Sequence, residues 1–108
     1  MRQTRIFEPG GTMAVVLVHQ GPTVTQERYE EVVRRLSGKD RVESPADWPV
    51  PGLLVHIAGR GEDGFRVVDV WESEDACRRF GDRLMPILEE IGIKDPPEMY
   101  PPHTVVVA

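Results

Sequence analysis

A histidine and an aspartate in two neighbouring apolar segments are the groups in this sequence best suited to acid–base chemistry. His56 lies in the run 53–59 and Asp69 in the run 65–71, and the segment 61–64 between them has the glycines of a hairpin turn. A carboxylate beside an imidazole orients the ring and stabilises its charged form, and imidazole titrates near neutral pH. We therefore predict that His56 and Asp69 form a catalytic general base. The other interpretation is structural: His56 only forms a hydrogen bond within a partly buried sheet, and Asp69 is solvated.

Four aromatic residues are predicted to bind the substrate of that base. Trp71 follows the aspartate by two positions and shares its face of the strand, where an indole either makes a flat wall for a conjugated ligand or fills the core. Tyr29 and Phe80 lie on the apolar stripes of the two predicted helices and are the residues expected to reach the cavity from that side. The ring of Tyr29 either only fills the core or also extends its hydroxyl to the cavity. Trp48 lies in a proline-rich loop, in the segment 44–52, and covers either the cavity mouth or an edge of the core.

Other chemistries lack the residues that they need. The three histidines, His19, His56 and His103, fall on three separate strands without the close spacing of a metal site, so we predict no bound metal. A single cysteine excludes an internal disulfide and a cysteine-based zinc site. The sequence also has no nucleophile elbow, P-loop or dinucleotide-binding glycine pattern.

Composition and charge narrow the range of partners. The chain has 108 residues, 40% of them hydrophobic, and a net charge of −5 at pH 7. This acidity argues against nucleic acid and anionic membranes as main partners, because the chain has no basic patch to bind them. No apolar run approaches the length of about 20 residues that spans a bilayer, and residues 1–12 lack the apolar stretch of a signal peptide. We expect one cytoplasmic domain over residues 13–108, preceded by an extension at 1–12.

The hydrophobic periodicity predicts four strands and two helices. Short β-branched runs indicate strands at 13–19, 53–59, 65–71 and 103–108. Apolar residues at helical spacing indicate one helix that begins after Thr23 or Thr25 and ends at Gly38, and a second over 74–91 that Pro86 kinks or restarts. The order β-α-β-β-α-β is that of a ferredoxin-like α+β fold, in which two helices cover one face of an antiparallel sheet.

Alternation along the two middle strands sorts their side chains into two faces. One face is nearly all aliphatic and is expected to pack on the helices: Leu53, Val55, Ile57, Arg66, Val68 and Val70. The other combines His56, Asp69 and Trp71 and is expected to form the cavity wall. We expect a second copy of the chain to bury the sheet face that the helices leave uncovered, which gives a two-fold homodimer. The apolar side chains of that face are predicted to be Phe65, Val67, Trp71, Val105 and Val107.

The strand-to-helix segment after the hairpin carries a family pattern. Val67, Trp71, Ser73 and Ala76 form the pattern V-x-x-x-W-x-S-x-x-A, a strand that ends in tryptophan followed by a serine-capped helix. With this pattern, residues 52–93 resemble the dimeric α/β-barrel superfamily, and most closely the small proteins grouped with the antibiotic-biosynthesis monooxygenases. The likeness extends over the whole predicted domain.

This resemblance implies a small enzyme without a bound cofactor, of monooxygenase, cyclase or isomerase type, that acts on an aromatic or polyketide-type metabolite. The alternative within the same fold is a non-catalytic ligand-binding or stress-associated dimer. A third interpretation, haem binding, ranks last: haem-degrading members have a histidine where this chain has Gly81, and an asparagine on the first strand, which 13–20 lacks. The polyketide oxygenases of the superfamily have an asparagine shortly before the strand-end tryptophan, where residues 67–70 here are Val-Val-Asp-Val.

Overall fold

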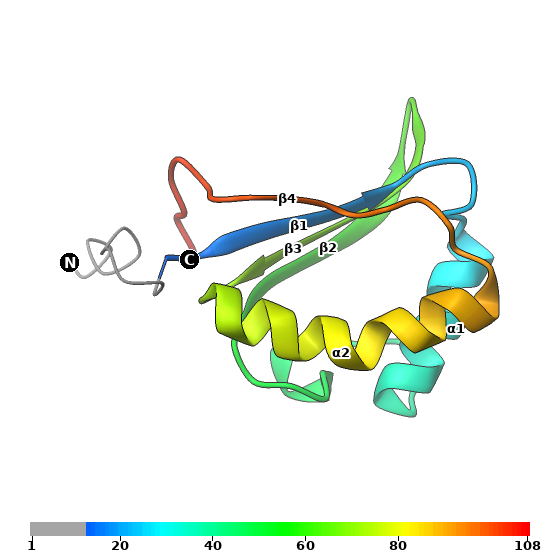
Figure 1. Cartoon of the computed structure of the whole chain (residues 1–108), viewed down its shortest axis with the longest axis horizontal. Coiled ribbons are helices and arrows are strands. Elements are labelled where there is room, and N and C mark those ends of the chain that lie inside the picture. Colours follow the sequence, from blue (N-terminus) through cyan, green and yellow to red (C-terminus); the bar gives the residue numbers. More distant parts are fainter. Residues whose placement is uncertain (1–12) are drawn as a thin grey trace.

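Two helices pack on one face of an antiparallel sheet (Figure 1). The computed structural model describes residues 13–108, so the extension predicted for 1–12 lies outside the described residues. The elements are, in order, β1 (Val15–Gln20), α1 (Gln26–Ser37), a 3-10 turn η2 (Pro45–Asp47), β2 (Leu53–Gly61), β3 (Gly64–Trp71), α2 (Glu74–Ile91) and β4 (Glu98–Tyr100). The strand order is β2-β3-β1-β4, and each neighbouring pair is antiparallel. The predicted ferredoxin-like α+β fold is confirmed.

The two helices begin and end where their capping residues predict. The hydroxyls of Thr25 and Ser73 accept hydrogen bonds from backbone N–H groups in the first turns of α1 and α2. Gly38 and Gly92 end the helices with φ values of 75° and 97°, a left-handed conformation that glycine adopts without steric cost. Of the two threonines considered for the first cap, Thr25 has this role, and Thr23 makes a different contact.

The second helix, α2, continues through Pro86. The proline has no N–H to bond the carbonyl of Asp82, one turn earlier. Both residues are exposed, so water can satisfy that carbonyl while the apolar stripe of α2 stays against the sheet. The helix therefore does not restart at Pro86, as one of the two sequence interpretations held. Neither helix within residues 13–108 is long and apolar enough to cross a membrane.

The last strand is shorter and earlier than predicted. β4 spans Glu98–Tyr100 and pairs with β1, whereas residues 103–108 lie outside the sheet. A pair of prolines on either side confines β4, because proline has no N–H to donate to a partner strand. The prediction of a strand at 103–108 was therefore wrong, and Val105 and Val107 do not belong to a sheet face.

One extra residue in β2 decides which of its side chains face the helices. Leu53 and Val55 lie opposite consecutive residues of β3, so Leu54 is an additional residue that forms a β-bulge. Beyond the bulge the pairing is regular, and His56 lies directly opposite Asp69. The bulge therefore allows Leu53 and His56, three positions apart, to share the helix-covered face.

The helices cover the sheet face that carries His56, Asp69 and Trp71, here called the mixed set, and not the face that is nearly all aliphatic. Trp71, Asp69 and Phe65 on β3 are buried beneath α1 and α2. The prediction that the aliphatic set packs on the helices was wrong for all its members except Leu53, which the bulge turns to the covered face. The placement of Phe65, Val67 and Trp71 on the uncovered face was also wrong. Hydrophobicity alone misleads here, because the polar groups of the mixed set bond to one another and so tolerate burial.

The face away from the helices carries aliphatic side chains, here called the aliphatic patch. Its members pair across three strands: Val16, Val18, Val55, Ile57, Val68 and Val70. The two valines of β1 are buried, those of β2 and β3 are half-buried, and Ile57, on the outer strand β2, is 59% exposed. The part of the patch that water reaches is therefore centred on Ile57.

The loop after β1 is tied to the loop after α2. The backbone N–H of Thr23 donates to the carboxylate of Asp95 at 2.8 Å, the Thr23 hydroxyl donates to the same oxygen, and that hydroxyl accepts from the backbone N–H of Lys94. These bonds from Thr23 hold the pKa of Asp95 below its usual value. The contact closes one end of the layer between sheet and helices.

Gly52 leaves no space for a side chain where the loop before β2 meets α2. Its φ is +111°, and a Cβ there would lie 2.7 Å from the Cβ of Ala76, which is fully buried. Gly52→Ala is expected to lower the free energy of unfolding in urea by about 2–4 kcal/mol, through backbone strain and overpacking together. Gly38→Ala is the matched control, because Gly38 also has a positive φ but open space around it, and should cost about 1 kcal/mol. Equal losses would contradict the close packing of Gly52.

Candidate functional site

The hairpin of β2 and β3 brings His56 and Asp69 together. The two residues are direct cross-strand partners, and His56 Nδ1 lies 2.6 Å from Asp69 Oδ1. Their side chains are 15% and 5% exposed, so the carboxylate has little contact with water. Hydrogen-bond donors from the protein take the place of that water. The structure thus places side by side the two residues predicted to form the general base.

Trp71 and Tyr29 extend this pair into a continuous hydrogen-bonded chain, here called the relay. Trp71 Nε1 donates to Asp69 Oδ2 at 3.3 Å, and the Tyr29 hydroxyl lies 2.6 Å from His56 Nε2. Because a carboxylate only accepts, Nδ1 of His56 carries the hydrogen, and Nε2 of the neutral ring accepts from the Tyr29 hydroxyl. The relay therefore runs Trp71–Asp69–His56–Tyr29, from the centre of the core outwards.

The hydroxyl of Tyr29 keeps its proton over a wide pH range. Burial raises the pKa of Tyr29 to about 12, and the negative charges of Asp69 and Glu30 act in the same direction. Below that pH the phenol is neutral. Tyr29 can therefore release its proton to a neighbour only if its hydroxyl oxygen accepts another proton at the same time. Tyr29 is thus suited to pass a proton to the imidazole and unsuited to act as a free phenolate.

Tyr29 is expected to titrate well above the ordinary range of tyrosine. An ultraviolet titration should show a phenol with a midpoint near pH 12 that Tyr29→Phe removes and Tyr100→Phe, on the exposed strand β4, leaves in place. The ordinary pKa of tyrosine is about 10. Between about pH 10 and 12 the folded state holds a proton that the unfolded state has lost, so Tyr29 makes stability fall as pH rises through this window. A midpoint for Tyr29 at the ordinary value would contradict its burial.

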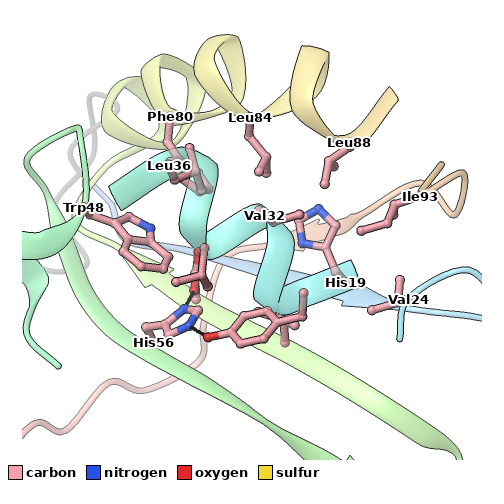
Figure 2. Close-up of a pocket in the computed structure, with 14 residues that line it drawn as sticks. His19, Val24, Val32, Leu36, Trp48, His56, Phe80, Leu84, Leu88 and Ile93 are labelled. Atoms are coloured by element: carbon pink, nitrogen blue, oxygen red, sulfur yellow. Dashed lines mark hydrogen bonds and ion pairs between the residues drawn. The ribbon is translucent and has the colours of Figure 1, made fainter. Parts of the chain in front are cut away.

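A small apolar pocket, here called the inner pocket, lies between the sheet and the two helices (Figure 2). Its free space is about 40 Å³. The relay residues Tyr29, His56 and Asp69 form part of its wall. The rest of the wall is largely apolar and comes from β1, β3, both helices and the loops: His19, Val24, Val32, Val33, Leu36, Trp48, Val67, Phe80, Leu84, Leu88 and Ile93. The inner pocket is therefore a space within the core that the relay borders.

A larger and more polar groove, here called the outer groove, shares Tyr29, Val33 and His56 with the inner pocket. It has a volume of about 610 Å³ and is formed by α1, the loop after it and the β2–β3 hairpin. Its charged lining residues are Glu30, Asp40, Arg41 and Arg60. The end of the relay is therefore in contact with a small apolar space and a large polar one, and His56 also lines a third space of about 220 Å³ beside the loop that carries Trp48.

The aromatic residues predicted to bind substrate surround the relay, but they do not all line the same space. The ring centre of Trp48 lies 4.6 Å from that of His56 and 6.2 Å from that of Phe80, and both Trp48 and Phe80 line the inner pocket. Trp71 lies behind them, fully buried and stacked on Phe80 at 4.7 Å, so that its indole reaches the relay and not the pocket. Trp48 both covers the core and borders the pocket. Contact of these aromatics with a substrate stays a prediction.

His19 belongs to the site, although the sequence analysis did not place it there. It lines the inner pocket, where its Nε2 is buried without a hydrogen-bond partner among the described residues, as is Nε1 of Trp48. Burial lowers the pKa of His19 and outweighs the opposing charge of Asp69, so the ring is neutral at pH 7. The sequence pattern that could have placed His19 in the site is the alternation Val15, Leu17, His19. It puts the histidine on the same strand face as two core residues.

Groups for metal binding or nucleophilic attack are not assembled at the site. Among residues 13–108, no three His, Cys, Asp or Glu side chains are placed to hold a metal ion together. Cys77 is buried on α2, where burial and the charges of Asp69 and Glu74 raise its pKa and so disfavour a reactive thiolate. The side chains gathered around the relay are suited to proton transfer.

Solved structures of other proteins have the same fold. SnoaB, a cofactor-independent oxygenase from Streptomyces nogalater, is 18% identical with a TM-score of 0.54, over 86% of this chain and 96% of that chain. A candidate antibiotic biosynthesis monooxygenase from Caulobacter crescentus is 21% identical with a TM-score of 0.54, over 86% and 89%. A candidate monooxygenase from Shewanella loihica is 20% identical with a TM-score of 0.55, over 92% and 100%. No family model and no curated protein matches the sequence. The chain therefore has the ferredoxin-like fold of the antibiotic-biosynthesis-monooxygenase-like proteins.

Proposed function

We propose that this protein is a small monooxygenase-like enzyme that acts without a bound cofactor on an aromatic or polyketide-type metabolite. The observation that carries the proposal is the relay, whose outer end, Tyr29 and His56, borders two spaces that reactants can occupy. Proteins of the same fold named as a cofactor-independent oxygenase and as candidate monooxygenases support it.

The relay acts as the base of the reaction. A substrate with an acidic C–H group gives its proton to the hydroxyl oxygen of Tyr29 while the Tyr29 proton moves to His56 Nε2, 2.6 Å away. The imidazolium that results is stabilised by Asp69, which Trp71 holds in place. Because the tyrosine stays neutral throughout, its raised pKa does not oppose the transfer.

The oxygen step needs only the substrate carbanion and dioxygen. The carbanion gives electrons to O2, a C–O bond forms, and the peroxide anion of the substrate takes up the proton that the relay holds. Loss of water, with removal of the second hydrogen from the same carbon, leaves a carbonyl group. The balance is R2CH2 + O2 → R2C=O + H2O, so the carbon is oxidised as both oxygen atoms are reduced.

Oxygen uptake tests this function. Hydroxylated anthrones are suitable probes, because they have an acidic CH2 group between two aromatic rings. The expected result is consumption of O2 with product, and transfer of one labelled atom from ¹⁸O2 to the new carbonyl group. Conversion without oxygen uptake would instead make the protein a cyclase or isomerase. Binding without conversion would favour the non-catalytic ligand-binding alternative.

We also propose that two copies of the chain associate through the aliphatic patch. A self-complementary apolar face suits a two-fold dimer, and association removes Ile57 and its neighbours from water. Ile57→Glu is expected to convert a dimer to a monomer in light scattering at micromolar concentration, because it buries an unpaired charge. Met85→Glu, at an exposed position of α2, is the control and should remain dimeric. A monomeric wild-type protein at this concentration would contradict the proposal.

A further inference from the structure

We infer that the inner pocket binds dioxygen while the organic substrate binds in the outer groove. This inference rests on the proposed oxygenase function and assigns its two reactants to separate spaces. Tyr29, Val33 and His56 line both of them. The end of the relay is then in contact with the substrate on one side and with dioxygen on the other.

The size of the inner pocket fits a molecule of two atoms and not an aromatic ring. Its free space is about 40 Å³. A cavity needs about 10–15 Å³ of such space to hold one water molecule, whereas an apolar cavity that admits benzene has about 150 Å³. The outer groove, with about 610 Å³, is large enough for a fused-ring substrate.

The wall of the inner pocket favours an uncharged, apolar guest. Side chains from both helices make up much of it, among them Val32, Leu36, Leu84 and Leu88. A water molecule in a protein interior depends on about two to four hydrogen bonds, which the aliphatic part of the wall does not supply. Dioxygen needs none. The aliphatic part of the wall, made by the two helices, therefore favours dioxygen, whereas the unpartnered polar groups lie on the sheet and in the loop.

An unpartnered indole N–H at the same wall suits dioxygen after it has accepted electrons. Trp48 Nε1 and His19 Nε2 are buried without a partner in the described residues, and Figure 2 shows the two side chains on opposite sides of the space beneath α2. The Trp48 residue is only 8% exposed, and an indole N–H can only donate. Superoxide and peroxide are anions, so a donor fixed at the wall stabilises them more than it stabilises neutral O2.

Separate spaces are compatible with the balance of the reaction. Dioxygen leaves the inner pocket where the two spaces meet, at Tyr29, Val33 and His56, and contacts the carbanion in the outer groove. The carbanion passes one electron to it there, which gives superoxide and a carbon radical in contact with each other. These combine when the C–O bond forms, and the peroxide anion of the substrate takes back the proton that the relay removed, which gives a hydroperoxide. Loss of water then completes the oxidation as written above. No further oxidant or reductant is needed.

Xenon locates the gas site directly, because it is an apolar atom that enters dry cavities. Crystals of the whole chain under xenon pressure are expected to show xenon between Val32 and Leu84. Val32→Ile adds one methylene group to the wall of the inner pocket only. It should abolish the xenon site and raise the KM for O2 by about fivefold or more. Val50→Ile is the matched control: Val50 is buried but lines neither space, so xenon binding and the KM for O2 should be unchanged.

The outcomes separate this inference from the proposed function. Oxygen-dependent turnover in a protein that takes up no xenon in the inner pocket, with the KM for O2 unaffected by Val32→Ile, would overturn the inference and leave the function standing. The anthrone product seated in the inner pocket of a co-crystal would overturn it as well. Xenon in the pocket of a protein that never consumes O2 would overturn the function, and with it the assignment of the pocket to dioxygen as a reactant.

Discussion

Replacing His56 with alanine is expected to lower turnover by about 100-fold or more and to destabilise the protein as well. The substitution removes the acceptor of the Tyr29 proton. It also removes a hydrogen-bond donor from Asp69, which leaves a buried carboxylate with the indole N–H of Trp71. That second effect should cost about 1–3 kcal/mol of unfolding free energy. Oxygen uptake measures the turnover, and urea denaturation measures the stability.

A second substitution separates the two effects. Asp69→Asn in the His56→Ala background replaces the poorly paired carboxylate with a neutral amide, so stability should recover in part while turnover stays lost. His103→Ala changes an exposed histidine outside the site and should alter neither property. A His56→Ala protein that keeps more than about a tenth of the wild-type rate would show that the base lies elsewhere.

Replacing Trp71 with alanine is expected to remove a large part of the stability of the fold. The side chain has no exposed surface and stacks on Phe80 at a centroid distance of 4.7 Å. Truncating a buried tryptophan to alanine costs about 3–5 kcal/mol, and a domain of this size has about 5–15 kcal/mol in all. Thermal unfolding should therefore begin far below the wild-type transition. A loss under about 1 kcal/mol would contradict the packing described for this ring.

Trp71→Phe tests the hydrogen bond and not the packing. Phenylalanine keeps an aromatic ring in the core but cannot donate to Asp69. Trp48→Phe is the matched control, because the Nε1 of Trp48 has no partner to lose among the described residues. Trp71→Phe is expected to be less stable than Trp48→Phe by about 1–2 kcal/mol. Equal stabilities would mean that the indole N–H does not support the carboxylate.

The fold was predictable from the sequence where its signals are local. Capping residues and glycines determine both ends of α1 and α2, and each acts within a few residues of its own position. The last strand shows the limit of that approach. The composition of 103–108 favours an extended chain whether or not a partner strand exists, and pairing depends on backbone groups far away in the sequence. Three residues between two pairs of prolines became β4 instead.

The part of the candidate site that lies on the β2–β3 hairpin was predictable from the sequence. Pairing of Gly61 with Gly64 sets the register of β2 and β3, and the same register places His56 opposite Asp69. The bond from Tyr29 to His56 was beyond prediction in this way, because it depends on how α1 packs on the sheet. The burial of the aspartate could not be predicted either, because it depends on which face of the sheet the helices cover.

The bulge at Leu54 means that the histidine of this site depends on chain length as much as on residue type. In a regular strand, two residues three positions apart lie on opposite faces, and Leu53 and His56 share a face only because of the additional residue. A homologue with a regular strand here would need one residue fewer to present its histidine in the same place. An alignment without a gap at position 54 would then match His56 to a residue that faces away from the helices. Insertions and deletions at this point are thus a route by which evolution could add or remove a base in this pocket while the neighbouring residues stay the same.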